Sequence, residues 1–245
     1  MKNFGLIGRS LSHSFSKKYF EKKFEDQDLR DHAYLNFELQ TIEEFKKVLK
    51  TPGLIGLNVT NPYKEKIIPF LDDLSVEANE IGAVNCIKLV RGKTIGYNTD
   101  AYGFGQSIKP FLDTTHDKAL ILGTGGAGKA VAYSLKKTGV DVFYATTSNK
   151  KNTNAFFYNE INERMMDAFK LIINTTPLGL FPNVNEAPAL PYRLFTDKHL
   201  AYDLIYNPEQ TLFLKQAKEK GAITINGLSM LQLQAEKSWE IWNQM

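Results

Sequence analysis

Short apolar runs alternate with longer amphipathic segments along the whole chain. Apolar runs closed by glycine or polar residues predict buried strands, and they lie at residues 4–8, 34–39, 54–60, 83–90, 119–122, 140–146, 171–174 and 200–204. Apolar positions spaced three or four apart predict helices, which lie at residues 16–28, 41–50, 100–112, 126–138, 209–220 and 228–242. Because strands and helices alternate and no hairpin signal dominates, the pattern predicts an α/β fold with parallel sheets.

Local signals mark several helix ends. Thr41 and Glu44 form a capping box at the start of the second helix, in which each side chain bonds the other's backbone. Pro62 suits the first turn of a helix after strand 54–60, because that position needs no N–H donor. A second strand–helix–strand series begins after Tyr102, so we expect two α/β domains.

Composition and charge exclude several classes of protein. The chain has 245 residues, and its 30 Lys and Arg against 27 Asp and Glu give a net charge of +3. Neither half is basic enough to indicate a nucleic-acid or membrane partner. The single cysteine, Cys86, excludes a disulfide framework and a multi-cysteine zinc site, and we expect no metal. No targeting segment or spanning helix is predicted, so we expect a cytoplasmic protein.

A glycine-rich loop carries the first chemical signal. It reads Gly123, Thr124, Gly125, Gly126, Ala127 and Gly128, after a predicted strand and at the start of a predicted helix. In that context the spacing is typical of a dinucleotide site, where backbone N–H groups and the helix N-terminus bind a pyrophosphate. The same stretch also fits a P-loop, but Ala130 stands where a P-loop needs a hydroxyl for magnesium.

The residues after the next strand favour NADP over NAD. An NAD site would place Asp or Glu there, on the ribose hydroxyls, whereas residues 144–151 contain no acid. Thr146, Thr147 and Lys150 are the candidates to hold a 2′-phosphate. The alternative for Lys150 and Lys151 is a solvated pair on a loop.

Polar clusters follow or precede the predicted strands of the first half, at Ser12–Ser16, Asn58–Lys64, Asn85 and Asn98–Asp100. Strand ends are where ligands bind in α/β sheets. Hydroxyls and amides with one Lys and one Asp suit a small polyhydroxylated acid, and a site that bonds every hydroxyl rejects analogues lacking one. Each group also has a structural alternative. The serines could be helix caps, and Asn58, Thr60 and Asn85 could hold turns through hydrogen bonds. Lys64 and Asp100 could form an ordinary ion pair.

The order of these motifs resembles the shikimate dehydrogenase family along nearly the whole chain. The motifs are His-Ser-x-Ser ending at Ser16, Asn-Val-Thr-x-Pro-x-Lys ending at Lys64, Gly-Ala-Val-Asn ending at Asn85, Asn-Thr-Asp ending at Asp100, the glycine loop, and Gly227-Leu-Ser-Met-Leu with Gln234. The resemblance implies reversible NADPH-dependent reduction of 3-dehydroshikimate to shikimate, in the biosynthesis of chorismate and the aromatic amino acids.

The resemblance also implies a role for each matching residue. Lys64 is the expected catalytic acid/base and is paired with Asp100. The expected substrate ligands are Ser14, Ser16, Asn58, Thr60, Asn85, Tyr206 and Gln234. Thr176, Leu204 and Gly227 are expected beside the nicotinamide.

The expected architecture is an N-terminal α/β substrate domain and a Rossmann-type domain with a cleft between them. Residues 1–101 and 229–245 form the substrate-binding and catalytic domain, and residues 102–228 form the dinucleotide-binding domain. The last helix returns to the first domain because Gln234 must reach the substrate. We expect a monomer or a homodimer.

Two departures from the family pattern bear on function. Lys17 replaces a proline after the second serine, and the arginine that usually binds the 2′-phosphate is missing from Ala145-Thr146-Thr147. Lys150 or Lys151 would substitute as a point charge, with weaker affinity than a bidentate arginine. The alternatives left open are a quinate or mixed quinate/shikimate dehydrogenase, and a dinucleotide-binding sensor without catalysis.

Overall fold

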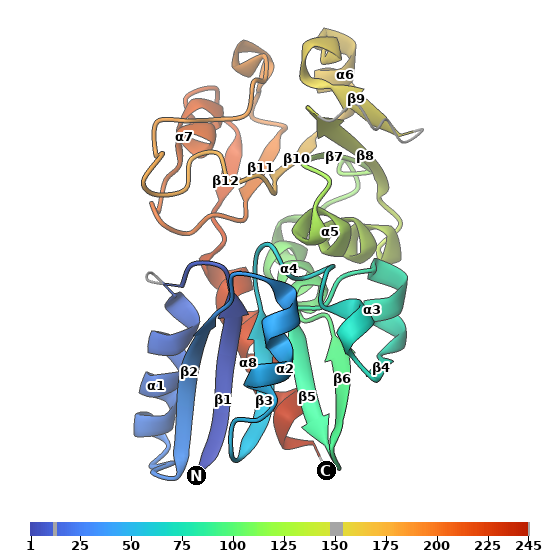
Figure 1. The fold of residues 1–245 in the computed structure, drawn as a ribbon. Helices are drawn as coiled ribbons and strands as arrows, with labels where there is room; N and C mark the ends of the chain where they lie inside the picture. Colours follow the sequence, from blue (N-terminus) through green and yellow to red (C-terminus); the bar gives the residue numbers. More distant parts are fainter. Residues whose placement is uncertain (12–13, 148–153, 245) are drawn as a thin grey trace. The chain divides into compact units, whose positions relative to one another are not determined.

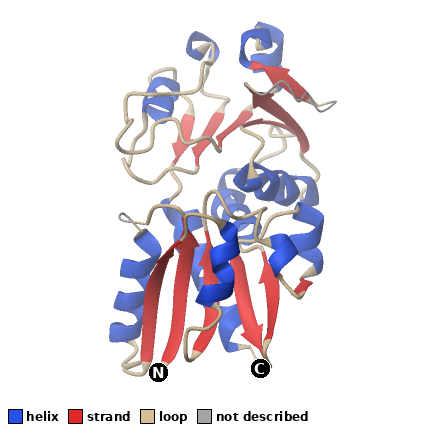
Figure 2. Ribbon diagram, viewed as in Figure 1, coloured by secondary structure: helices blue, strands red, loops and turns tan. Residues whose placement is uncertain are grey.

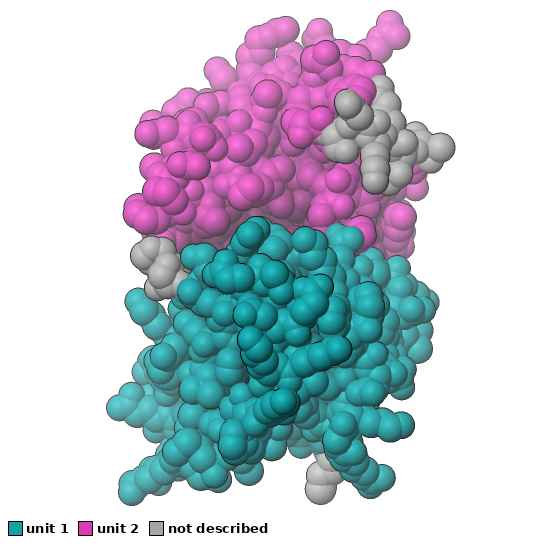
Figure 3. Space-filling view, in the orientation of Figure 1, with its two compact units in different colours: residues 1–99, 235–245 teal, residues 100–234 magenta. Residues whose placement is uncertain are grey.

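The computed structural model describes residues 1–11, 14–147 and 154–244. They form two compact units (Figure 3): unit 1 is Met1–Thr99 with Ala235–Met245, and unit 2 is Asp100–Gln234. The first boundary falls two residues before the expected one, and the second falls six residues after it. Each unit contains one six-stranded sheet.

The sheet of unit 1 is mixed, not parallel throughout. Its order is β2-β1-β3-β5-β6-β4, with β1 parallel to β2 and β3, and β5 antiparallel to β3 and β6. The strands are β1 Lys2–Gly8, β2 His32–Glu38, β3 Leu54–Val59, β4 Asp73–Leu74, β5 Cys86–Val90 and β6 Lys93–Tyr97.

A hairpin that the sequence pattern did not predict explains the antiparallel strands. Arg91 and Gly92, between β5 and β6, have φ values of 50° and 77°. Positive φ at both central residues is typical of the tight turn that joins antiparallel strands. The prediction of purely parallel sheets was therefore wrong for unit 1.

Helices cover both faces of this sheet (Figure 1). On one face, Phe4 and Leu6 of β1 pack with α1, Phe15–Asp26, and with the C-terminal part of α8, Leu228–Asn243. On the other face, Ile7 packs with Ile42 and Phe45. The remaining helical segments of unit 1 are η1 Ile42–Glu44, α2 Phe45–Val48, η2 Ile68–Phe70 and α3 Val76–Ile81.

One helix of unit 1 is shorter than predicted and one is absent from the described residues. The segment 41–50 contains a short 3-10 turn followed by the four-residue helix α2. The predicted capping box is present, with Glu44 Oε2 accepting the Thr41 backbone N–H at 3.4 Å. Pro62 opens no α-helix: the residues after it form turns that lead to η2.

The sheet of unit 2 is parallel throughout its described strands, in the order β12-β11-β10-β7-β8-β9. In chain order this is 6-5-4-1-2-3, the strand order of dinucleotide-binding doubly wound sheets. The strands are β7 Lys118–Leu122, β8 Asp141–Thr146, β9 Ala155–Phe157, β10 Leu171–Asn174, β11 Leu200–Asp203 and β12 Ile223–Ile225.

Figure 2 shows the strands and helices of both units. Alternate residues of β7 belong to two separate cores, as a doubly wound sheet requires. Ala119 and Ile121 pack with α4 and α5, and Leu120 and Leu122 pack with α6 and α7. Burial on both faces explains the continuous apolar strand pattern. The helical segments are α4 Asp100–Ile108, η3 Lys109–Phe111, α5 Gly126–Lys137, η4 Tyr158–Glu160, α6 Glu163–Ala168, η5 Tyr192–Leu194 and α7 Leu212–Lys218.

Candidate active site

Strand directions bring the polar clusters of unit 1 to one edge of its sheet. β1, β3 and β6 run the same way, so their carboxyl ends share an edge, and antiparallel β5 begins at that edge. The loops after β1 and β3 carry Ser14 and Thr60, Asn85 precedes β5, and Thr99 follows β6. Segments distant in sequence therefore meet here, as the clustering at predicted strand ends indicated.

The side chain of Asn58 is bonded within the protein. Tyr34 Oη donates to Asn58 Oδ1 at 2.8 Å, and Asn58 Nδ2 donates to the Asn85 carbonyl at 3.3 Å and to Ser238 Oγ at 2.9 Å. Only 5% of the residue is exposed. These contacts favour the structural alternative for Asn58, and its role as a substrate ligand stays a prediction.

Asn85 is held by the residue that precedes Asp100. Asn85 Nδ2 donates to Thr99 Oγ1 at 3.0 Å, and the Thr99 backbone N–H donates to Asn85 Oδ1 at 2.6 Å. Thr99 Oγ1 also lies 3.2 Å from Ser238 Oγ, and Thr99 and Ser238 are fully buried. Sequence reasoning missed the positioning roles of Thr99 and Ser238; the available signal was a serine beside the apolar Trp239 in the last helix.

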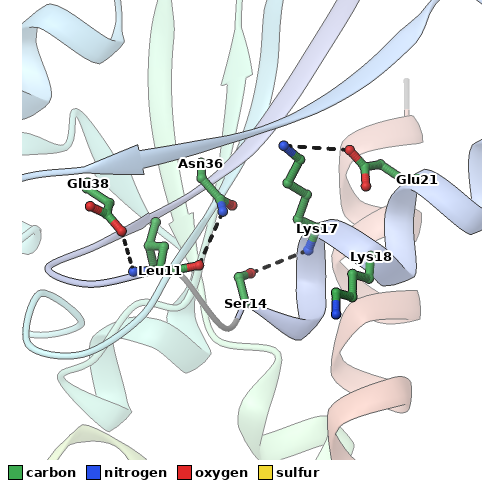
Figure 4. A pocket seen from close by; sticks show the side chains of 7 residues that line it. All are labelled: Leu11, Ser14, Lys17, Lys18, Glu21, Asn36 and Glu38. Carbon is green, nitrogen blue, oxygen red and sulfur yellow. Dashed lines mark hydrogen bonds and ion pairs between the residues drawn. The ribbon is translucent and has the colours of Figure 1, made fainter.

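Ser14 lies at the N-terminus of α1, beside a hollow of about 610 Å³ (Figure 4). Its Oγ caps the helix by accepting the Lys17 N–H at 3.4 Å. Glu38 Oε1 accepts the Leu11 N–H at 2.7 Å and so holds the backbone at Leu11. The hollow is lined by Leu11, Ser14, Lys17, Lys18, Glu21, Asn36 and Glu38.

The charges around the hollow are mixed. Lys17 pairs with Glu21 at 3.7 Å, which leaves the Lys18 ammonium as the other cation of the lining. Ser16, the second predicted carboxylate ligand, is hydrogen-bonded to Tyr34. Burial raises the pKa of Tyr34 well above its ordinary value, and the bond with Ser16 lowers that pKa only in part. Ser14 therefore serves as a helix cap, in agreement with its structural alternative, and its contact with a substrate stays a prediction.

The backbone of Lys64 is held by a hydrogen bond, and that of Asp100 by its place at the start of a helix. The Lys64 carbonyl accepts the Val84 N–H at 2.7 Å, which ties the turn after β3 to the segment before β5. Asp100 is the first residue of α4 and is 6% exposed; a helix N-terminus favours a carboxylate. The two residues belong to different units, and their pairing stays a prediction.

The glycine loop has the backbone of an anion-binding turn. Gly123 adopts a left-handed φ of +104°, and a Cβ on Gly128 would lie 2.7 Å from the Gly123 carbonyl oxygen. Both positions therefore require glycine. A Cβ on Gly125, at the N-cap of α5, would meet no atom within 4 Å, so open space faces the N–H groups of the first helical turn.

This arrangement fits a dinucleotide pyrophosphate. Open space, backbone donors and the partial positive charge of the α5 N-terminus lie together, and the first turn of α5 contains no acid. Residue 130 is a fully buried alanine. Its side chain has no hydroxyl that could bind the magnesium of a P-loop.

Thr175 and Thr176 follow β10, which lies next to β7 in the sheet. The strands after β7 are added on one side of this pair and those after β10 on the other, so the two threonines lie at the point where the strand order reverses. Thr175 Oγ1 donates to the Leu122 carbonyl at 2.8 Å. Thr176 is held by Asn174, whose Oδ1 accepts its N–H at 3.0 Å and its hydroxyl at 2.6 Å.

Leu204, Tyr206 and Gly227 lie on two loops of unit 2 that contact each other. The Gly227 N–H donates to the Ile205 carbonyl at 3.0 Å, and a Cβ on Gly227 would overlap the Leu204 carbonyl oxygen. Gly227 is therefore required for this close approach. Tyr206 is half-buried, and burial raises its pKa.

The other predicted ligands of unit 2 lie at element ends. Gln234 on α8 is 8% exposed, and its Nε2 donates to the Leu231 carbonyl at 2.9 Å. Gly103 of α4 permits close packing there, because a Cβ would lie 3.0 Å from Gln234 Cβ. Thr146 ends β8 and is buried, and Thr147 is exposed. Lys150 lies outside the described residues.

The described residues contain neither a metal-ligating cluster nor a membrane-spanning helix. Within residues 1–11, 14–147 and 154–244, no group of three or more His, Cys, Asp or Glu side chains could hold a metal ion. In the same described part of the chain, no helix is long and apolar enough to cross a membrane.

Comparisons with known proteins agree with the fold. Residues 6–87 match the family model described as the shikimate dehydrogenase substrate binding domain, and they lie in unit 1. The chain is 40% identical to the shikimate dehydrogenase (NADP(+)) of Methanococcus aeolicus, over 97% of this chain and 90% of the relative. It is 41% identical to that of Carboxydothermus hydrogenoformans, with the same two coverages.

Solved structures give the same result. The chain is similar to shikimate dehydrogenase from Aquifex aeolicus, with a TM-score of 0.88, 37% identity and coverage of 99% of this chain and 92% of that one. It is also similar to shikimate 5-dehydrogenase from Thermus thermophilus in complex with NADP(H) and shikimate, with a TM-score of 0.87, 31% identity and coverages of 100% and 94%. A quinate dehydrogenase from Corynebacterium glutamicum in complex with NAD is 27% identical, with a TM-score of 0.87 and coverages of 100% and 94%.

Taken together, the doubly wound sheet of unit 2, its glycine loop and the polar edge of unit 1 define an α/β oxidoreductase with a substrate domain and a Rossmann-like domain. The identities over nearly the full length specify the family. The chain belongs to the shikimate dehydrogenase family. The predicted fold class and family resemblance are confirmed.

Proposed function

We propose that this chain catalyses the reversible NADPH-dependent reduction of 3-dehydroshikimate to shikimate. The observation that carries the proposal is the gathering of Ser14, Thr60 and Asn85 at one sheet edge, in a chain that continues from that edge into Asp100. The names of the relatives support the substrate and the cofactor. The reaction belongs to chorismate and aromatic amino acid biosynthesis, in the cytoplasm, with the enzyme as a monomer or homodimer.

The substrate side chains recognise a polyhydroxylated acid. Ser14 and Ser16 hold its carboxylate, and Thr60, Asn85, Asp100 and Gln234 bind ring hydroxyls, with Tyr206 covering the ring. Because the described side chains of Asn85 and Gln234 are almost fully buried, an analogue lacking a hydroxyl would leave a buried polar group unpaired. Such a loss produces strong discrimination.

The cofactor is bound through unit 2. The N–H groups of the Gly123–Gly128 loop hold the pyrophosphate, and Thr146, Thr147 and Lys150 hold the 2′-phosphate. Thr176, Leu204 and Gly227 line the nicotinamide side. When bound, NADPH supplies the hydride that reduces the ketone. Lysine in place of the family's arginine makes the preference for NADP over NAD weaker.

Lys64 supplies the proton. Its ammonium donates to the ketone oxygen on which negative charge develops, and it accepts the proton in the reverse direction. General acid catalysis of this kind contributes about 10²–10⁴-fold. Asp100 opposes the loss of that charge, because a neighbouring carboxylate favours protonated lysine.

Quinate is the second candidate substrate, and the similarity to a quinate dehydrogenase with NAD supports testing it. Quinate carries one more hydroxyl on the carboxylate-bearing carbon, so Ser14, Ser16 and Thr60 would decide between the two acids.

The test measures initial rates with shikimate and quinate, each with NADP⁺ and NAD⁺, from the absorbance of the reduced nicotinamide. The largest kcat/KM is expected for shikimate with NADP⁺. A larger value for quinate would transfer the assignment to the second candidate. Cofactor binding without turnover of either acid would identify a sensor and contradict the proposal.

A further inference from the structure

Asp203, the last residue of β11, is a fully buried carboxyl to which the proposed mechanism gives no role. Its Oδ1 accepts hydrogen bonds from Asn174 Nδ2 at 3.1 Å and from the Ile205 N–H at 3.0 Å. Its Oδ2 accepts from Thr211 Oγ1 at 2.6 Å. These three donors are neutral.

A buried carboxylate without a cationic partner is costly for stability. Burial raises the pKa of Asp203 to about 6, and the bonds from Thr211, Ile205 and Asn174 lower it only in part. A well-packed apolar residue in such a place is often as stabilising or more so. Stability alone therefore does not account for an acid at this position.

The contacts of Asp203 link two loops. Asn174 lies opposite Asp203 in the β10–β11 pair, and the same Asn174 side chain holds Thr176 through its Oδ1. On the other side, Asp203 fixes the Ile205 N–H, while the Ile205 carbonyl accepts the Gly227 N–H at 3.0 Å. A continuous hydrogen-bonded path thus joins Thr176 to the loop that carries Leu204 and Tyr206.

Thr211 anchors the far end of this path. Its hydroxyl donates to Asp203 Oδ2 and also accepts the Leu214 N–H at 3.3 Å, as the N-cap of α7. The side chain is fully buried. The start of α7 and the end of β11 are therefore held by the same hydroxyl.

We propose that Asp203 is a positioning residue, which sets Thr176 relative to Leu204–Tyr206 through Asn174, Ile205 and Thr211. The inference rests on the proposed function, which assigns these two loops to the nicotinamide and the substrate. Asp203 touches neither ligand. A carboxylate suits this position because Asn174, Ile205 and Thr211 all donate hydrogen bonds to it. An asparagine would place its NH₂ group, a donor, opposite the Thr211 hydroxyl, which also donates.

The first variant is Asp203→Asn, which keeps the shape and removes the charge. A small misplacement of reacting groups lowers the rate by about 10²-fold, so kcat with shikimate and NADP⁺ is expected to fall about 10- to 100-fold. The melting temperature is expected to change little, since the removal of a buried charge offsets the loss of the hydrogen bond from Thr211. A kcat and KM within about twofold of wild type would overturn the inference.

A second pair of variants tests the same path without altering Asp203. Thr211→Val removes the hydroxyl at similar volume and is expected to lower kcat at least about fivefold, whereas Thr211→Ser keeps the hydroxyl and restores it. Asn162→Ala is the matched control, because Asn162 caps α6 by accepting the Met165 N–H at 3.2 Å and lies outside the path. It is expected to lower the melting temperature less than Thr211→Val, because it removes an exposed cap alone, and to leave kcat unchanged.

The outcomes separate this inference from the proposed function. Wild-type activity with shikimate together with unchanged kcat in Asp203→Asn and Thr211→Val would overturn only the positioning role. Equal losses of stability in Thr211→Val and Asn162→Ala, with kcat unchanged in both, would make Thr211 a helix cap alone and would also overturn it. A wild-type enzyme without turnover of either acid contradicts the proposed function, and the inference falls with it.

Discussion

Ser238 Oγ of α8 accepts a 2.9 Å hydrogen bond from the side-chain amide of Asn58, 180 positions earlier in the chain. Ser238 also contacts Thr99 Oγ1 at 3.2 Å. The last helix thereby completes the polar edge of unit 1, because the residues that hold Asn58 and Asn85 converge on it. The proposed substrate site thus depends on a side chain outside every sequence motif of the family.

Ser238→Ala is expected to lower the free energy of unfolding by about 1–3 kcal/mol, because buried donors lose an acceptor. Urea unfolding would measure it as a lower midpoint. Ser229→Ala is the control, since Ser229 lies on the same helix and is exposed. Equal midpoints for the two variants would show that the buried bonds of Ser238 contribute nothing.

Lys64→Ala is expected to lower kcat by about 10²–10⁴-fold with little change in the KM for shikimate. The proton donor is lost, whereas the hydroxyl ligands remain. Equal losses in kcat and substrate affinity would instead make Lys64 a substrate clamp. Steady-state rates at several pH values provide the measurement.

Asp100→Asn is expected to impair both kcat and KM, because it would remove the proposed hydroxyl contact and the proposed charge partner of Lys64. The same steady-state assay measures it. A near-normal Asp100→Asn enzyme would remove Asp100 from the mechanism.

Gly125→Ala is expected to raise the KM for NADP⁺ about tenfold, which corresponds to about 1.4 kcal/mol, and to change stability by less than about 1 kcal/mol. The φ of −76° at Gly125 is normal for alanine, and its Cβ would meet no protein atom. The new methyl group would therefore affect only a bound pyrophosphate. Kinetics and thermal unfolding measured together make the test.

Gly128→Ala is the matched comparison, because its Cβ would lie 2.7 Å from the Gly123 carbonyl oxygen. It is expected to lower stability by about 1–3 kcal/mol through overpacking. An unchanged cofactor KM in Gly125→Ala would contradict pyrophosphate binding at this loop.

Lys150→Ala is expected to lower kcat/KM for NADPH about two- to tenfold, the range of an exposed charge contact, with NADH unchanged. The ratio of the two kcat/KM values is the measurement. A wild-type preference for NADH would contradict the proposed 2′-phosphate site.

Glu236 provides a test of stability against pH. Lys23 Nζ lies 2.7 Å from Glu236 Oε2, and Tyr19 Oη donates to Glu236 Oε1. Burial raises the pKa of Glu236, but the bonds from Lys23 and Tyr19 outweigh it, so the pKa is lowered. A lowered pKa contributes stability above the unfolded value, about 4.3, and this contribution is lost as the pH falls through the folded value.

The expected difference between wild type and Glu236→Gln is about 0.5–1 kcal/mol at pH 7. It should shrink as the pH falls below the unfolded value and vanish once Glu236 is protonated in the folded protein as well. Melting temperatures of both proteins across that range provide the measurement, and a constant difference would exclude the ionisation of Glu236 as its source.

The sequence predicted the elements best where strands are buried on both faces. The run Leu171–Asn174 agrees with β10 residue by residue, because its three apolar residues between Lys170 and Asn174 are too few for a helix. β9 and β12 were missed, since three-residue strands show no periodicity. Lys93–Tyr97 was missed because it alternates too weakly to distinguish a strand from a loop.

The polar residues of the candidate site were predictable as a set but not as a geometry. Asn58 lies near the end of β3 and Asn85 directly precedes β5, and the sequence indicates such strand ends. Their hydrogen-bond partners Tyr34, Thr99 and Ser238, however, come from other segments. Asp203 likewise depends on Asn174, 29 positions away. Pairings across such separations are fixed by the topology of the sheets, which periodicity does not specify.

The contacts of Trp242 determine which fragments of the chain can be expressed alone. Its indole packs on Gly56, where a Cβ would overlap the ring, and its Nε1 donates to the Ile87 carbonyl at 3.0 Å. A fragment that stops at Thr99 would uncover Phe4, Phe20 and Tyr34, the aromatic partners of this ring. Unit 1 is therefore not an N-terminal piece that can be excised; expressing it alone requires residues 235–245 to be joined to it by a linker.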